Sequence, residues 1–110
     1  MTTYIVYFDF DKATLTDAAQ AVIAEAVKMA KVNGFVKIQV TGHTDTVGSD
    51  SYDQNLSISR AQAVRDEMVR EGVDASAIAA EGKSFHDLLV PTGPGVREQQ
   101  NDRAVIEFGS

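Results

Sequence analysis

The chain has 110 residues, of which 44% are hydrophobic and 24% charged, values that suit one domain over residues 1–110 with its own core. It has no cysteine, which excludes disulfides and thiolate chemistry. Its net charge of −6 disfavours nucleic acid as a partner, because phosphate contacts need clustered basic residues. No apolar run reaches the ~18 residues of a membrane span, and Met1 leads directly into strand-like residues without a signal peptide. We therefore expect either a cytoplasmic protein or a domain of a longer chain.

The first half of the chain predicts a strand and then a helix. Tyr4 to Phe8 is a β-branched and aromatic run that favours a strand. From Leu15 the apolar residues recur at helical spacing, until Asn33-Gly34 gives a stop signal. Thr14 or Thr16 can cap this helix, with Asp17 in its first turn. The predicted buried stripe comprises Leu15, Ala19, Val22, Ala26 and Met29.

A second strand and a second helix follow. Val36, Ile38 and Val40 alternate with polar residues, as in a strand with one buried face. Residues 42–50 form a polar loop, and a helix from Ser49 or Asp50 to Glu71 ends at Gly72. Its predicted stripe comprises Tyr52, Leu56, Arg60, Ala63 or Val64, and Met68.

The last part predicts two more strands separated by a long loop. Ile78 to Lys83 reads as a short strand, Ser84 to Gln100 as a loop rich in proline and glycine, and Arg103 to Phe108 as a strand. The apolar run 88–90 is expected to pack over one end of the sheet, with a partner-docking patch as the alternative. The order β-α-β-α-β-loop-β predicts an α+β fold, with two helices on one face of a mixed four-stranded sheet.

Arg60 is anomalous because it lies on the face that carries Leu56 and Val64. An arginine that faces a core needs a partner, since an unpaired buried charge is costly. Two interpretations remain open from the pattern. Arg60 forms a structural ion pair with a loop carboxylate, which is the commoner case, or it belongs to a binding site.

Asp45 is the second candidate, in a loop between a buried strand and a helix start. Such loops commonly hold ligands in layered folds. The alternative is an aspartate that forms a turn or caps the helix.

Three segments together resemble a known family. They are residues 7–15, the run Gly42-His43-Thr44-Asp45 with Gly48-Ser49, Tyr52, Leu56-Ser57, Arg60-Ala61 and Val64 after it, and residues 101–105. In this order and at these spacings, they are similar to OmpA-like domains, and also to peptidoglycan-associated lipoproteins and the C-terminal domains of flagellar stator proteins. A match in order over nearly the whole chain is far more specific than a single short motif.

The resemblance implies non-covalent binding of peptidoglycan, with no catalysis and no cofactor. In that family the ligand feature is the zwitterionic end of diaminopimelate in the stem peptide. By this resemblance Asp45 accepts hydrogen bonds from the ammonium and Arg60 holds the carboxylate, both in one pocket. Backbone N–H groups near Phe10 and Asp11 can complete the carboxylate site. The expected location is the periplasm of a Gram-negative bacterium, in a longer chain with an outer-membrane, lipoprotein or inner-membrane anchor. The oligomeric state stays open.

Phe10, Asp11, Asp53 and Leu56 also match ligand-contacting positions of the family, as the floor and rim of the pocket. Asp11 can instead cap the first helix, and Leu56 can simply be core. These alternatives stay open at this point.

The sequence departs from the family pattern at three positions. Asp53 replaces an asparagine, and a carboxylate cannot donate a hydrogen bond as an amide does. Asp102 replaces the first arginine of a closing pair, and Ser59 replaces an arginine next to Arg60. We expect a more acidic site, with affinity or ligand preference changed more than the fold. The alternative function is therefore an interaction or oligomerisation module that does not bind the wall.

Two kinds of catalytic site are disfavoured. A metal cluster would draw on acids such as Asp9 and Asp11, which alternate across a strand end and point to opposite faces, so no metal site is expected. A serine hydrolase needs a sharp Gly-x-Ser-x-Gly turn, and none is present. His43 is expected to be a loop side chain, hydrogen-bonded or exposed, and His86 to be solvated.

Overall fold

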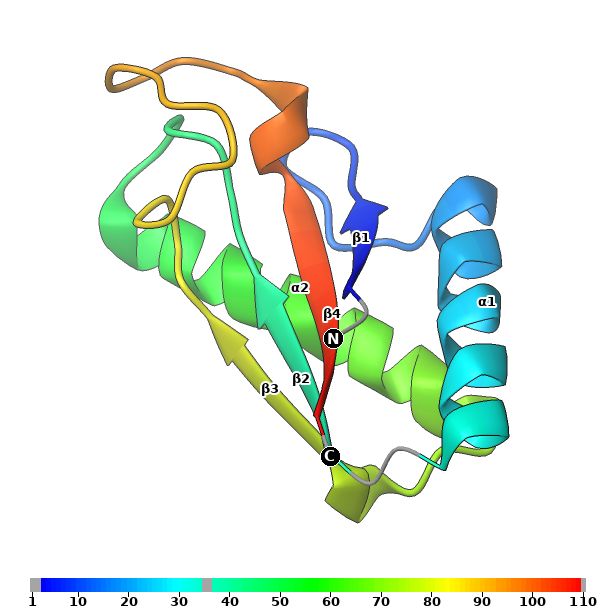
Figure 1. Cartoon of the computed structure of the whole chain (residues 1–110). Coiled ribbons are helices and arrows are strands. Elements are labelled where there is room, and N and C mark those ends of the chain that lie inside the picture. The colour runs from blue at the N-terminus through cyan, green and yellow to red at the C-terminus, as the bar shows by residue number, and fades with distance from the viewer. Residues whose placement is uncertain (1–2, 35–36, 110) are drawn as a thin grey trace.

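In the computed structural model, which describes residues 3–34 and 37–109, a four-stranded sheet carries two long helices on one face (Figure 1). The strands are β1 (Thr3–Tyr7), β2 (Lys37–Gly42), β3 (Ile78–Gly82) and β4 (Arg103–Gly109). The helices are α1 (Asp17–Asn33) and α2 (Asp50–Arg70), with short 3-10 helices η1 (Ala75–Ala77) and η2 (Gln99–Asn101). The predicted α+β order is confirmed, and the predicted strand residue Val36 lies outside the described residues.

The sheet order, β1-β4-β2-β3, brings distant parts of the chain to one edge. β4 runs antiparallel to both of its neighbours, whereas β2 and β3 are parallel. Tyr7 pairs with Arg103, and Gly42 pairs with both Ala104 and Gly82. The carboxyl ends of β1, β2 and β3 therefore meet the start of β4 at a single edge of the sheet.

The core lies between the helices and the near face of the sheet. The buried residues of α1 are Ala19, Ile23, Ala26, Val27 and Ala30. The predicted stripe had the right period, and its half-buried members Leu15 and Val22 pack against the core. It was wrong at Met29, which is only half-buried, and it lacked the buried Ile23, Val27 and Ala30. Apolar residues occupy both phases of this alanine-rich helix, so its spacing leaves open which of them faces the sheet.

Both helices start as local chemistry requires. The Thr16 hydroxyl accepts a hydrogen bond from the N–H of Ala19 at 3.0 Å, and Ser49 accepts one from Tyr52 at 3.2 Å. Thr16 is thus the first cap, not Asp11. Within the described ranges, no helix is long and apolar enough to cross a membrane.

Two glycines let α2 lie directly on the sheet. A Cβ at Gly42 would stand 1.8 Å from the carbonyl oxygen of Ser57, and one at Gly82 would stand 2.3 Å from the Ser57 hydroxyl oxygen. Ser57 therefore sits over the ends of β2 and β3. The turns of α2 before Ser57 project beyond the sheet edge, which is why Tyr52, predicted in the buried stripe, is 52% exposed.

Candidate functional site

A small cavity opens at the sheet edge where the strand ends meet. The segment after β1 is held there by the N–H of Phe8, which donates to the Asp102 carbonyl at 2.8 Å. The segment after β2 is held by the N–H of His43, which donates to the Arg103 carbonyl at 2.8 Å. The cavity has a volume of about 170 Å³ and is lined by Phe10, Asp11, Asp45, Val47, Gly48, Tyr52, Asp53, Leu56 and Asp102. Five of the six predicted site residues line it, and the sixth, Arg60, lies behind its wall.

Arg60 is fully buried and is held by groups of the chain itself. Its Nη1 donates to a carboxylate oxygen of Asp102 at 2.8 Å, in an ion pair with almost no exposure on either side. Its remaining hydrogen bonds go to the backbone carbonyls of His43 (2.9 Å), Lys12 (2.8 Å) and Asp9 (3.1 Å). The guanidinium also lies 5.3 Å from the centre of the Phe8 ring. This is the structural ion pair that the sequence left open. A direct contact between Arg60 and a ligand stays a prediction.

Asp102 joins Arg60 to the cavity. Its Oδ1 atom accepts both from Arg60 Nη1 and, at 3.1 Å, from the backbone N–H of Asp45. Its own N–H donates to the Gln99 carbonyl at 3.0 Å. The side chain is 2% exposed and the backbone is held on both sides, so Asp102 forms a fixed part of the cavity wall.

Asp45 contributes to the cavity wall a carboxylate in which one oxygen atom lacks a hydrogen-bond partner. One oxygen, Oδ1, accepts from the N–H of Val47 at 3.0 Å, and the other, Oδ2, is buried without a hydrogen-bond partner. Burial, and then the neighbouring Asp102 carboxyl, raise the pKa of Asp45 from 3.8 to about 7, against the lowering effect of the Val47 N–H. Asp45 thus forms an Asx-type turn through Oδ1, and its Oδ2 atom would be stabilised by a cation or a proton.

Asp53 is a second buried carboxylate in the same wall. It is 1% exposed, and its Oδ2 atom also lacks a hydrogen-bond partner. Burial raises its pKa to about 6, although the Arg60 charge works in the opposite direction. Two of the three buried acids of the cavity are therefore short of positive charge.

The rim of the cavity comes from the start of α2 and from the segment after β1. Asp11 adopts a left-handed backbone conformation (φ 57°), and its carboxylate accepts a hydrogen bond from the Tyr52 hydroxyl. In this part of the chain, the backbone N–H groups of Phe10 and Asp11 make no hydrogen bond with other described residues. Leu56 is half-buried in the cavity wall and is not part of the core cluster. Asp11 and Leu56 both line the cavity, so the cap and core alternatives are wrong, whereas their contact with a ligand stays a prediction.

His43 lies beside the site but faces away from solvent. The side chain is 3% exposed, and its Nδ1 atom has no hydrogen-bond partner. Burial and the Arg103 charge lower its pKa to about 4, so the ring is neutral at pH 7. The expectation of a hydrogen-bonded or exposed loop side chain was wrong about its burial. His86 is exposed, as predicted, and contacts the Asp50 carboxylate at 2.9 Å. Among the residues that the structure describes, no three acids or histidines are grouped to hold a metal ion.

The long loop over residues 84–98 packs against the loop that follows β2, which contains Asp45 and Thr46. The Thr46 hydroxyl donates to the Gly93 carbonyl at 2.7 Å and accepts from the N–H of Val96 at 2.9 Å. The side chain of Asn101 holds Val90 through two hydrogen bonds, at 2.8 and 2.9 Å. Figure 1 shows this loop over the end of the sheet, as expected for the 88–90 run, although Leu89 remains 44% exposed.

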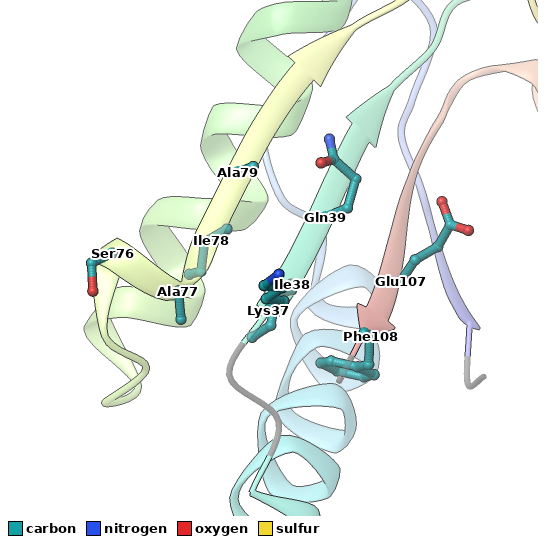
Figure 2. A pocket seen from close by; sticks show the side chains of 10 residues that line it. Lys37, Ile38, Gln39, Ser76, Ala77, Ile78, Ala79, Glu107 and Phe108 are labelled. Atoms are coloured by element: carbon teal, nitrogen blue, oxygen red, sulfur yellow. The ribbon is translucent and has the colours of Figure 1, made fainter.

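A larger hollow of about 540 Å³ lies at the opposite end of the sheet and does not share this chemistry. Figure 2 shows its lining side chains, from β2, β3, β4 and η1. Its charged members are Lys37, which is exposed, and Glu107, which is half-buried. Neither has the buried, unsatisfied oxygen atoms found at Asp45 and Asp53, so the smaller cavity is the better candidate site.

The predicted site did not include four residues that line the cavity, Val47, Gly48, Tyr52 and Asp102, or the neighbouring Arg97. Asp102 was noted only as a departure, although a buried Arg60 called for an acid and Asp102 was one within the closing segment. Tyr52 was assigned to the core. Arg97, whose guanidinium carbon lies 3.6 Å from the centre of the Phe10 ring, comes from a loop without a periodic signal that could have placed it.

The fold is that of a small α+β domain with a candidate binding cavity at one end of its sheet. The OmpA family model matches residues 7–102, and the chain belongs to that family. A curated relative, an outer membrane protein of Gluconacetobacter diazotrophicus, is 40% identical over 94% of this chain but only 29% of its own length. The chain spans 53% of another relative, outer membrane protein A of Bordetella avium, at 30% identity over 93% of this chain.

Solved structures agree with the observed fold. The peptidoglycan-associated lipoprotein from Burkholderia pseudomallei superposes with a TM-score of 0.87 and 27% identity, over 96% of this chain and 90% of the other. The OmpA-like domain of FopA1 from Francisella tularensis gives a TM-score of 0.85 and 28% identity, over 98% and 75% of the two chains. The predicted α+β arrangement is thus that of known OmpA-like domains.

Proposed function

We propose that this domain binds peptidoglycan without cleaving it, through the diaminopimelate of the stem peptide, and so anchors a longer chain or the outer membrane to the cell wall. The family and the name of the similar lipoprotein from Burkholderia pseudomallei support the wall as partner. The expected location is the periplasm, which agrees with the outer-membrane relatives.

The carrying observation is the pair of buried, unpartnered oxygen atoms of Asp45 and Asp53 in one cavity wall. A buried carboxylate oxygen without a donor is costly, and an ammonium group supplies both donors and charge. The cavity, at about 170 Å³, lies below the ~300–1,000 Å³ of pockets for drug-sized ligands. It suits the end group of a side chain better than a whole substrate.

The remaining polar groups of the rim suit the carboxylate end of the same ligand. The backbone N–H groups of Phe10 and Asp11, which donate to no other described residue, are available to a carboxylate bound beside these two lining residues. Arg60 acts in this proposal as a positioning residue, because it fixes Asp102 and the segments around Asp9 and Lys12. A few charged hydrogen bonds give single-site affinity on the order of micromolar, and the repeated wall increases retention.

The test is retention of the 110-residue chain on purified sacculi that contain diaminopimelate. Asp45→Asn keeps the shape of the side chain and removes its charge, and we expect about tenfold or greater loss of retention. Asp66→Asn is the matched control, because Asp66 lies on α2 with its side chain 73% exposed. Equal retention of the wild type and Asp45→Asn would contradict the proposed site. No retention of a folded wild type would favour the interaction-module alternative.

A further inference from the structure

The guanidinium group of Arg60 is already paired with acceptors of the chain itself. All three guanidinium nitrogen atoms donate hydrogen bonds, and the only carboxylate among the acceptors is Asp102. Arg60 has no exposed surface and is absent from the cavity lining. A ligand carboxylate therefore cannot reach the guanidinium unless it displaces Asp102.

Displacement of Asp102 is unfavourable. Its Oδ1 atom holds both Arg60 and the N–H of Asp45, and its backbone is fixed by Gln99 and Phe8. A ligand that took its place at Arg60 would leave a buried carboxylate without a partner, and breaking a buried ion pair is strongly destabilising.

The charges that face the cavity repel a second anion. Asp45, Asp53 and Asp102 are each at most 3% exposed and line one small space, with Asp11 at the rim. The buried cation Arg60 is paired with Asp102 behind the cavity wall, and the exposed Arg97 lies 3.6 Å from the centre of the Phe10 ring. The unpartnered Oδ2 atoms of Asp45 and Asp53 are themselves buried but, unlike Arg60, belong to residues that line the cavity, so an ammonium group in the cavity reaches them after a small movement of these two side chains.

We propose, on the basis of the function proposed above, that Asp102 sets the ligand preference of this domain. Because it supplies from within the chain the carboxylate that Arg60 requires, the cavity selects a primary alkylammonium group. A carboxylate beside that group meets only the neutral N–H groups of Phe10 and Asp11, and these act against the repulsion of the buried acids. The ligand class is a stem-peptide amine whose neighbouring carbon carries a neutral group, such as a carboxamide, or no substituent. Free diaminopimelate still binds through its ammonium end.

The experiment compares two probes by NMR titration of the 110-residue chain at physiological salt. One probe is meso-diaminopimelate, and the other is 1,5-diaminopentane, the same carbon skeleton without its two carboxylates. For the wild type we expect 1,5-diaminopentane to bind at least as tightly as diaminopimelate, with shifts around Asp45 and Asp53. Asp45→Asn removes the ammonium partner and should weaken both probes, whereas the exposed control Asp66→Asn should leave both unchanged.

Two variants test the role of Asp102. Asp102→Asn removes the internal carboxylate and should move the ratio of the two affinities at least about tenfold towards diaminopimelate. Asp53→Asn is the comparison variant, because it removes a cavity charge without touching the Arg60–Asp102 pair, and it should weaken both probes but move the ratio less than Asp102→Asn does. If Asp102→Asn does not fold, the ratio of the two affinities in the wild type is the test.

The outcomes separate this inference from the proposed function. Diaminopimelate binding about tenfold tighter than 1,5-diaminopentane in the wild type overturns the inference and leaves wall binding intact. An unchanged ratio in every folded variant also overturns it. If neither probe binds at millimolar concentration, both the inference and the diaminopimelate site fail.

Discussion

Replacement of Arg60 by methionine tests whether the buried ion pair holds the site together. The change keeps an unbranched apolar stem but removes the guanidinium, which leaves Asp102 unpaired and three backbone carbonyls without their donor. Breaking a buried pair by removal of one partner costs about 3–5 kcal/mol. For a domain of this size that corresponds to a decrease in Tm on the order of 10–20 °C.

A double-mutant cycle followed by thermal and urea denaturation measures the pair itself. In the double variant of Arg60→Met and Asp102→Asn, the unpaired charge is absent, so we expect it to be more stable than the sum of the single effects implies, by roughly 2 kcal/mol. Arg65→Met is the matched control on the same helix. Its ion pair with Asp66 is long (3.4 Å) and exposed, so the expected change is below about 0.5 kcal/mol. A decrease of less than about 3 °C for Arg60→Met, or strict additivity, would refute this account of Arg60.

Three further predictions concern pH, packing and metals. The folded-state pKa values of Asp45 (about 7) and Asp53 (about 6) are raised above 3.8. Between pH 3.8 and about 7, the folded state therefore binds more protons than the unfolded state. The wild type should therefore lose stability relative to Asp45→Asn as pH rises from 5 to 8, and parallel urea-denaturation curves at each pH would contradict the assignment. Gly42→Ala should cost more than about 2 kcal/mol, because its Cβ meets the Ser57 carbonyl. Gly93→Ala, with nothing within 4 Å, should cost less than about 0.5 kcal/mol, and similar Tm values for the two would be inconsistent with the close approach of α2. Addition of EDTA should leave the Tm unchanged, whereas a decrease would reopen the metal alternative.

The elements of this fold could be predicted because their boundaries depend on local chemistry. Thr16, Ser49 and Gly72 mark helix ends through capping and a positive φ, and such signals lie within a few residues of the structure they set. The phase of α1 could not be predicted, because alanine on neighbouring faces makes two stripes nearly equivalent. Packing against the sheet decides between them.

The residues that line the candidate site could be predicted better than the hydrogen bonds and ion pairs between them. The family resemblance placed Asp45, Asp53 and Leu56 in one cavity wall, as the structure does. It also placed Arg60 in contact with the ligand. In the structure the guanidinium pairs instead with Asp102, which lies 42 positions further along the chain. Whether Asp102 or a ligand pairs with Arg60 is set by the antiparallel start of β4, and helical spacing carries no information about such a tertiary neighbour.

The last strand along the chain has a central place in the sheet, with consequences for the order of assembly. β4 lies between β1 and β2, and the residue just before it completes the wall of the cavity. In a polypeptide that emerges amino end first, β1 and β2 therefore lack the strand that joins them until β4 is released. The cavity is therefore complete only after Asp102 and β4 have emerged.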